Sequence, residues 1–180
     1  VVCGFGRTGK MFGMEHWGVV PDIMSIGKGL SSSYLPCASA IATEEVAEVF
    51  VGEGNIFSMT LTFGGHPVAA AAALKNIEII EGEGLVQNSA DVGTYYLDQL
   101  HLLKEDHPII GNVRGLGLML SMELVSDHET KEGFPSELRV PQRLSEKFRS
   151  EGLIMGVVGS YINMMPPLCV IRSEVDEIVA

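Results

Sequence analysis

Apolar residues recur at helical spacing in two consecutive segments near the middle of the chain. The first follows His66-Pro67 and runs through an alanine-rich stretch, 68–74, to Ile80. Proline suits the first position of a helix, so we predict that a helix begins there. In the second segment, 85–103, apolar residues stand three or four positions apart, which predicts an amphipathic helix. These residues are Val92, Tyr96, Leu100 and Leu103.

Shorter apolar runs, bounded by glycine, proline or polar residues, predict strands and short helices elsewhere. The predicted strands are 22–26, 38–42, 109–114, 118–125, 153–158, 160–165 and 168–171, and the predicted short helices are 44–51, 138–151 and 173–180. Two further segments, 54–65 and 126–137, are predicted loops. Because strands and helices interleave, the expected fold class is α/β leading into α+β. A boundary near residue 86, where long helices replace a loop-rich half, divides the chain into domains 1–86 and 87–180.

The balance of charge narrows the classes of function. Lys plus Arg number 12 against 23 Asp plus Glu, which gives a formal net charge of −11 over 180 residues. Such an acidic chain lacks the basic surface that binds nucleic acid or anionic lipid. The longest strictly apolar run, 68–74, is too short to cross a bilayer.

The cysteines and the chain ends suggest a compartment and an incomplete chain. Cys3, Cys37 and Cys169 are widely spaced and form no C-x-x-C pair, which favours reduced thiols in a cytoplasmic protein. The chain opens on Val1 instead of methionine, and its last predicted helix stops after about two turns. We therefore expect a fragment of a larger protein.

Lys28 is the first candidate for chemistry. It follows the predicted buried strand 22–26 and stands between Gly27 and Gly29, with no carboxylate beside it in sequence. Partial desolvation there would disfavour the ammonium form and favour the free amine that a nucleophile needs. The two glycines would let a planar ligand approach closely. The alternative is a lysine that extends from a strand end into solvent.

Two glycine motifs near Lys28 do not predict nucleotide binding. Residues 4–9 match G-x-G-x-x-G, but no sustained apolar helix pattern follows and Asp22 comes too early to contact a ribose. A glycine-rich loop is the simpler interpretation. A phosphate-binding P-loop is excluded, because it needs glycine where Asp22 stands and Ser or Thr where Gly29 stands.

Thr62 is the second candidate. Its hydroxyl and the glycines that follow lie immediately before the helix predicted at Pro67, a position that favours a bound phosphate. The alternative is a helix cap with a flexible lead-in. No histidine shows metal-ligand spacing, and no G-x-S-x-G motif supports a serine hydrolase. An amine able to form a Schiff base and a phosphate cradle are together what pyridoxal 5'-phosphate requires.

Several motifs in the same order resemble class III (omega) aminotransferases, which are pyridoxal-phosphate enzymes of fold type I. They comprise Gly-Phe-Gly-Arg-Thr-Gly at 4–9, Trp-Gly-Val-Val-Pro-Asp at 17–22, Thr-Phe-Gly-Gly-His-Pro at 62–67, Val-Arg-Gly-Leu-Gly-Leu-Met at 113–119 and Pro-Pro-Leu at 166–168. The resemblance covers nearly the whole chain. It implies that 1–86 is the C-terminal part of a large cofactor-binding domain and that 87–180 is most of a small α+β C-terminal domain.

The resemblance also implies a reaction. Lys28 would hold the cofactor as a Schiff base and move a proton between substrate and cofactor, and Thr62 would contact the cofactor phosphate across the interface of a homodimer. The enzyme would pass an amino group from an amine or omega-amino acid to a 2-oxo acid, with pyruvate as the expected acceptor.

Two departures from the family pattern bear on these expectations. The acidic residue that would pair with the pyridinium nitrogen would lie before Val1, so we expect the 180-residue chain alone to be inactive. Gly156 stands where some relatives carry an arginine that holds the substrate carboxylate. Two alternatives remain open: another fold-type-I enzyme such as an aminomutase or a decarboxylase, and a non-catalytic fragment.

Overall fold

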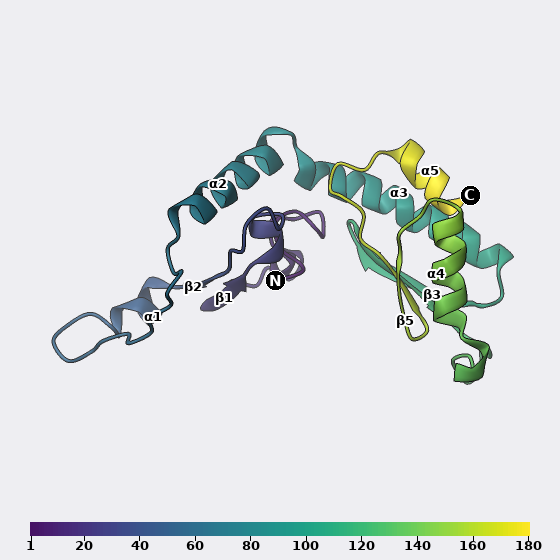
Figure 1. Cartoon of the computed structure of the whole chain (residues 1–180), viewed down its shortest axis with the longest axis horizontal. Coiled ribbons are helices and arrows are strands. Elements are labelled where there is room, and N and C mark those ends of the chain that lie inside the picture. The colour runs from purple at the N-terminus through teal and green to yellow at the C-terminus, as the bar shows by residue number, and fades with distance from the viewer. The chain divides into compact units, whose positions relative to one another are not determined.

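The computed structural model describes all 180 residues and divides into two compact units, Val1–Val86 and Gln87–Ala180. Each unit is described by itself (Figure 1). None of the helices combines the length and the apolar character that a membrane span requires.

The first unit contains a two-stranded antiparallel sheet. Strand β1, Ile23–Ile26, pairs with β2, Ser39–Ala42, so that Ile23 lies opposite Ala42. Both strands match the predicted positions, but the prediction that the first is buried is wrong, because Ile23 is 61% exposed and every residue of β2 is exposed. A sheet of two strands has little of its own surface to bury, and even the better covered residues of β1, Met24 and Ile26, are only half-buried.

The glycine-rich loop at residues 4–9 is closed by its own backbone. Gly6 N–H donates to Met11 O, and Gly9 N–H donates to Gly6 O. Only a short 3-10 helix, η1 at Gly13–Trp17, follows. A dinucleotide fingerprint would open a long helix here, so the simpler interpretation as a loop is confirmed.

Three helical elements complete this unit. They are η2 at Lys28–Leu30, α1 at Glu44–Glu48 and α2 at Pro67–Gly82. Pro67 opens α2 as predicted, and the small side chains of Ala69 and Ala73 are buried on one face. The helix predicted at 44–51 is shorter than expected, because tighter turns follow Glu48, with Phe50 N–H donating to Ala47 O and Val51 N–H donating to Glu48 O.

The second unit packs helices against a four-stranded antiparallel sheet. The strand order is β3-β4-β6-β5, with β3 at Ile110–Leu116, β4 at Met119–Leu124, β5 at Gly156–Val158 and β6 at Tyr161–Met164. Buried and partly exposed residues alternate along β4, so one face of the sheet carries the core. The buried residues of that strand are Leu120, Met122 and Leu124.

Helices supply the other half of this core. The long helix α3, Leu85–Asp106, buries Val92, Tyr96 and Leu100 in the same cluster, which confirms the predicted amphipathic pattern. Partly buried residues of α4, Val140–Ser150, pack against the cluster, and so does Val175 of α5, Arg172–Val179. Figure 1 shows α3 and α4 beside the sheet.

The strand predicted at 168–171 is absent. Val170 N–H donates to Pro167 O in a turn, and α5 begins at Arg172. The side-chain amide of Asn88 on α3 donates to Leu168 O at 2.7 Å and to Val170 O at 3.0 Å. The carbonyl groups that a strand partner would have bound are therefore satisfied by a side chain.

A close approach in the second unit joins α3 to the turn between β3 and β4. A Cβ atom at Gly93 would lie 2.2 Å from the carbonyl carbon of Gly117. In the same turn Leu118 N–H donates to the buried Ser89 Oγ at 3.3 Å. Glycine at position 93 is therefore required by backbone-to-backbone packing.

We predict that Gly93→Ala destabilises the second unit by about 2 kcal/mol or more. Overpacking against a backbone costs up to about 3 kcal/mol, and the better helix propensity of alanine offsets about 1 kcal/mol of that. Urea unfolding followed by circular dichroism measures the change. The matched control is Gly156→Ala, since a Cβ atom at Gly156 meets nothing within 4 Å. Equal stability of the two variants would contradict the packing described here.

Candidate functional site

Lys28 lies at the point where β1 gives way to a tight turn. It is the first residue of η2 and adopts a left-handed backbone conformation, with φ of 48°. Its side chain is exposed, so the predicted apolar setting is absent from this chain. The reason is that β1 lies in a two-stranded sheet and is not a buried strand.

The turn that begins at Lys28 is strained. Three non-glycine residues within six positions have positive φ, namely Lys28 at 48°, Ser32 at 47° and Ser33 at 62°. A side chain in the left-handed region costs roughly 1–2 kcal/mol. Strain of this kind persists only where the surroundings enforce it, and it is common at functional sites.

The side chain of Asn76 on α2 enforces this conformation. Its Nδ2 donates to Gly29 O at 2.8 Å and to Leu30 O at 3.1 Å. Its Oδ1 accepts a hydrogen bond from Ser32 Oγ at 2.7 Å. Sequence reasoning missed Asn76, although an asparagine on an alanine-rich helix, where its helix propensity is poor, was a usable signal.

The glycine-rich loop at 4–9 packs against the turn at Gly29. A Cβ atom at Gly29 would lie 3.1 Å from Phe5 Cβ and 3.5 Å from Gly4 O. Phe5 itself is buried. The prediction that Gly29 makes room for a planar ligand is therefore wrong, because atoms of Phe5 and Gly4 occupy that space.

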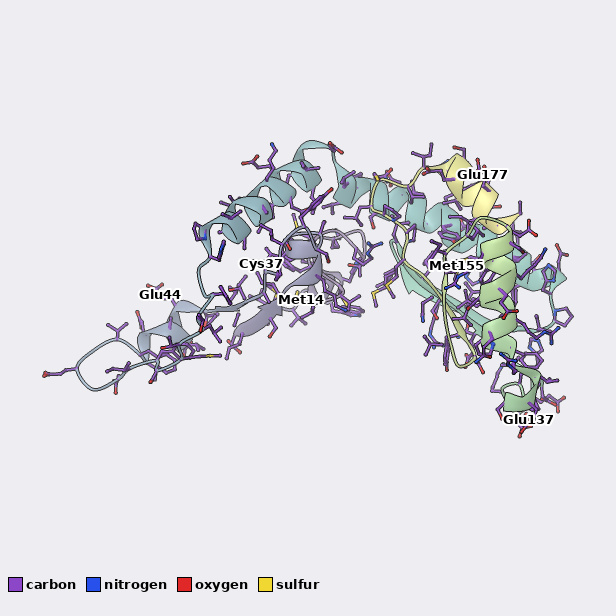
Figure 2. All side chains as sticks on the ribbon, viewed as in Figure 1. Met14, Cys37, Glu44, Glu137, Met155 and Glu177 are labelled. Carbon is purple, nitrogen blue, oxygen red and sulfur yellow. The ribbon has the colours of Figure 1, made fainter.

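Gly27, on the other side of Lys28, is less crowded. A Cβ atom there would meet Ala38 Cβ at 3.5 Å and Cys37 O at 3.7 Å, which is ordinary van der Waals contact. Figure 2 labels Cys37 in the segment that passes this point. Of the two glycines that flank Lys28, Gly29 is therefore the one that tight packing requires.

Thr62 lies in an exposed turn before α2. Gly64 N–H donates to Leu61 O at 2.9 Å, and Gly65 has φ of 68°. The Thr62 hydroxyl makes no hydrogen bond within the chain, and none joins it to Lys28. The structure therefore leaves this hydroxyl available but does not bring the two candidate residues together.

The first turn of α2 is capped by His66. Ala69 N–H donates to His66 Nδ1 at 3.5 Å, and Ala70 N–H donates to His66 O at 3.0 Å. Pro67 has no N–H group to offer. Few free N–H groups thus remain at this helix end, and any phosphate contact would rest on Thr62 and the turn around it.

Thr62 belongs to a segment whose apolar side chains are exposed, which we call the apolar segment, residues 49–63. Figure 1 shows the chain beyond α1 extending away from β1 and β2, and Figure 2 marks Glu44 where α1 begins. The exposed side chains are Val49, Phe50, Val51, Ile56, Phe57, Met59, Leu61 and Phe63. Apart from the edge-to-face contact of Phe50 with Phe57, these residues lack packing partners of the kind that a core provides.

Other polar groups do not assemble a second reactive centre. No three His, Cys, Asp or Glu side chains come together in a way that could hold a metal ion. His16 Nε2 lies 2.9 Å from Thr8 O and so contributes to the loop around residues 4–9. Burial lowers the pKa of Arg7 in the same loop, from a value so high that the guanidinium stays charged at neutral pH.

Comparison with known proteins identifies the relatives of this chain. Residues 1–180 match the model of the class III aminotransferase family. A diaminobutyrate–2-oxoglutarate transaminase from Halomonas elongata is 41% identical, over 100% of this chain and 39% of that protein. A putrescine–pyruvate aminotransferase from Pseudomonas aeruginosa is 38% identical, over 99% of this chain and 39% of that protein.

A solved structure shows the same fold. The chain matches an amine transaminase from an uncultivated Pseudomonas species, described in its PLP-bound, internal aldimine form, with a TM-score of 0.95 and 37% identity. The match covers 99% of this chain and 41% of that one. The chain thus spans about two fifths of the length of the relatives it matches.

We predict that the left-handed conformation of residue 28 makes Lys28→Gly more stable than Lys28→Ala by about 0.5–1 kcal/mol. Relief of about 1–2 kcal/mol of strain is partly offset by about 0.4–1 kcal/mol, because glycine makes the unfolded chain more flexible. Urea unfolding measures both variants. At Lys75, inside α2, the order should reverse by about 1 kcal/mol. A more stable alanine at both positions would contradict the conformation of Lys28.

Proposed function

The chain belongs to the class III aminotransferase family, and from that premise we propose that the whole protein transfers an amino group from an amine or omega-amino acid to a 2-oxo acid. Its fold is part of a pyridoxal-phosphate transferase of fold type I. We assign residues 1–86 to the C-terminal part of the large cofactor-binding domain and residues 87–180 to the small C-terminal domain.

Lys28 carries this proposal. Its exposed side-chain amine extends from a strained turn at the end of a strand, and Asn76 holds that turn in place. Lys75, in the same unit, is instead paired with Glu78 at 3.0 Å. An amine on a rigid turn can be presented to a ligand at a fixed position, which covalent catalysis requires.

The residues present fit pyridoxal 5'-phosphate. The amine of Lys28 would bind the aldehyde carbon, and the hydroxyl of Thr62 would donate to a phosphate oxygen. When bound, the cofactor supplies an electron-withdrawing ring that stabilises the carbanion formed at the substrate carbon. The Nζ atom of Lys28 would also serve as the base that takes a proton from the substrate carbon and as the acid that returns one.

A second copy of the chain would complete the site. The apolar segment, residues 49–63, exposes a group of large apolar side chains that water solvates poorly, and it includes Thr62. We propose that this segment is covered in a homodimer and places Thr62 near Lys28 of the partner subunit. This arrangement accounts for the lack of any contact between Thr62 and Lys28 within one chain.

Pyruvate is the proposed acceptor. The name of the Pseudomonas aeruginosa relative specifies pyruvate, whereas that of the Halomonas relative specifies 2-oxoglutarate. The net charge of −11 and three free cysteines agree with small-molecule substrates and with a cytoplasmic location.

We expect the whole protein to move ¹⁵N from a labelled amine to added pyruvate, giving ¹⁵N-alanine by mass spectrometry. Hydride reduction of the cofactor-loaded protein should then fix the cofactor on the peptide that contains Lys28. Lys28→Ala should remove both signals, because no other amine occupies this turn. Residues 1–180 alone should give no labelled alanine.

Other products would reject the proposal. Label that stays on a rearranged substrate would indicate an aminomutase, and loss of carbon dioxide would indicate a decarboxylase. Reduction that tags a lysine other than Lys28 would reject the site assignment. A whole protein that shows no cofactor absorbance would support the non-catalytic alternative.

We predict that Thr62→Ala weakens cofactor binding by about tenfold or more, since a hydrogen bond to a charged group contributes about 1.5–3 kcal/mol. At limiting cofactor, a mixture of Lys28→Ala and Thr62→Ala proteins should regain up to about a quarter of wild-type activity. Half of the dimers would be mixed, and each would hold one intact site out of two. No recovery on mixing would place both residues in one subunit's site and overturn the shared arrangement.

A further inference from the structure

We propose that Asn76 is a positioning residue that fixes the turn after Lys28 and thereby sets the place of the reactive amine. This inference rests on the proposed function of Lys28. The amide of Asn76 donates to the carbonyl groups of the two residues that follow Lys28, Gly29 O and Leu30 O. It also accepts a hydrogen bond from Ser32, the next left-handed residue of the turn.

The turn needs an external restraint because its own backbone favours relaxation. Lys28 stands between two glycines, which rotate more freely than other residues. Its φ of 48° lies in a region that lysine rarely adopts. The backbone bonds inside the turn, Leu30 N–H to Gly27 O at 3.1 Å and Ser31 N–H to Lys28 O at 3.3 Å, leave the Gly29 carbonyl unbound. Asn76 supplies the bond to that carbonyl.

Rearrangement of the backbone at Gly29 and Leu30 is the motion that Asn76 opposes, because its amide holds both carbonyl groups. Without these bonds the turn would be free to relax as a whole, which would let Lys28 leave its positive φ and would change the direction of its side chain. The four-carbon stem of lysine converts a small change at the backbone into a large displacement of the amine. Misplacement by about 1 Å can lower a rate by about a hundredfold.

The chain contains a matched control for this interaction. Asn88 on α3 also donates from its side-chain amide to two backbone carbonyl groups, Leu168 O and Val170 O. Asn88 belongs to the second unit, whereas the turn at Lys28 belongs to the first. Asn88→Ala therefore removes a chemically similar pair of hydrogen bonds from a different segment of irregular backbone.

The test compares Asn76→Ala with Asn88→Ala in the whole protein. We expect both to lower the melting temperature. Asn76→Ala alone should lower kcat by about 10- to 100-fold with KM for the amine within about twofold. It should also slow the uptake of pyridoxal phosphate by the cofactor-free protein, followed by absorbance, whereas Asn88→Ala should change neither rate.

The opposite pattern overturns the inference. If Asn76→Ala lowers stability as Asn88→Ala does but keeps kcat and the uptake rate within about twofold of wild type, the amide serves stability only. Should Asn76→Ala not fold, Asn76→Asp keeps the shape and the acceptor for Ser32 and replaces the two N–H donors, with Asn88→Asp as its control. Failure of both Asn76 variants to fold, while both Asn88 variants fold, would equally assign the amide to stability.

Failure of the proposed function gives a different result. In that case wild-type protein takes up no pyridoxal phosphate, or Lys28→Ala takes it up as wild type does, whatever residue stands at position 76. That outcome would remove the basis of this inference together with the proposed function. Normal uptake by wild type with unaltered rates in Asn76→Ala would reject the positioning role alone.

Discussion

A left-handed turn held by one side-chain amide is the constraint on which the candidate site depends. The turn at Lys28 contains three residues whose backbone conformation is unfavourable for any side chain. At roughly 1–2 kcal/mol each, the strain is comparable to the three hydrogen bonds of Asn76, which contribute about 0.5–1.5 kcal/mol each. The balance is close, so the turn also depends on the packing of Gly29 against Phe5. The motif at residues 4–9 and the lysine turn are thus parts of one structure.

Periodicity predicted the regular elements well. The long helices α2 and α3 and the strands of the second unit lie where apolar spacing placed them, because each buries one face against a neighbour. The failures occur where that condition does not hold. The strand at β1 was predicted to be buried from its apolar residues, yet it lies in a sheet of two strands and alternates between exposed and half-buried residues. An apolar run reports that burial is favourable, and it does not report which surface provides it.

Lys28 and Thr62 could be chosen as candidates from the sequence, but the hydrogen bonds that hold the turn at Lys28 could not be predicted from it. Lys28 stands out because two glycines flank it, whereas Asn76 lies 48 positions further along the chain and acts through a side-chain amide. The segment 168–171 shows the same difficulty, since Asn88 satisfies its carbonyl groups from 80 residues away. Both asparagines lie on helices and bind irregular backbone elsewhere. Local patterns carry no record of such long-range hydrogen bonds.

The exposed side chains of the apolar segment affect aggregation of the newly made chain and the dependence of its stability on concentration. Exposed apolar side chains of this kind are the surfaces on which newly made chains aggregate. In the proposed homodimer this surface would be covered, and stability would then depend on protein concentration, because dilution favours the separated, exposed form.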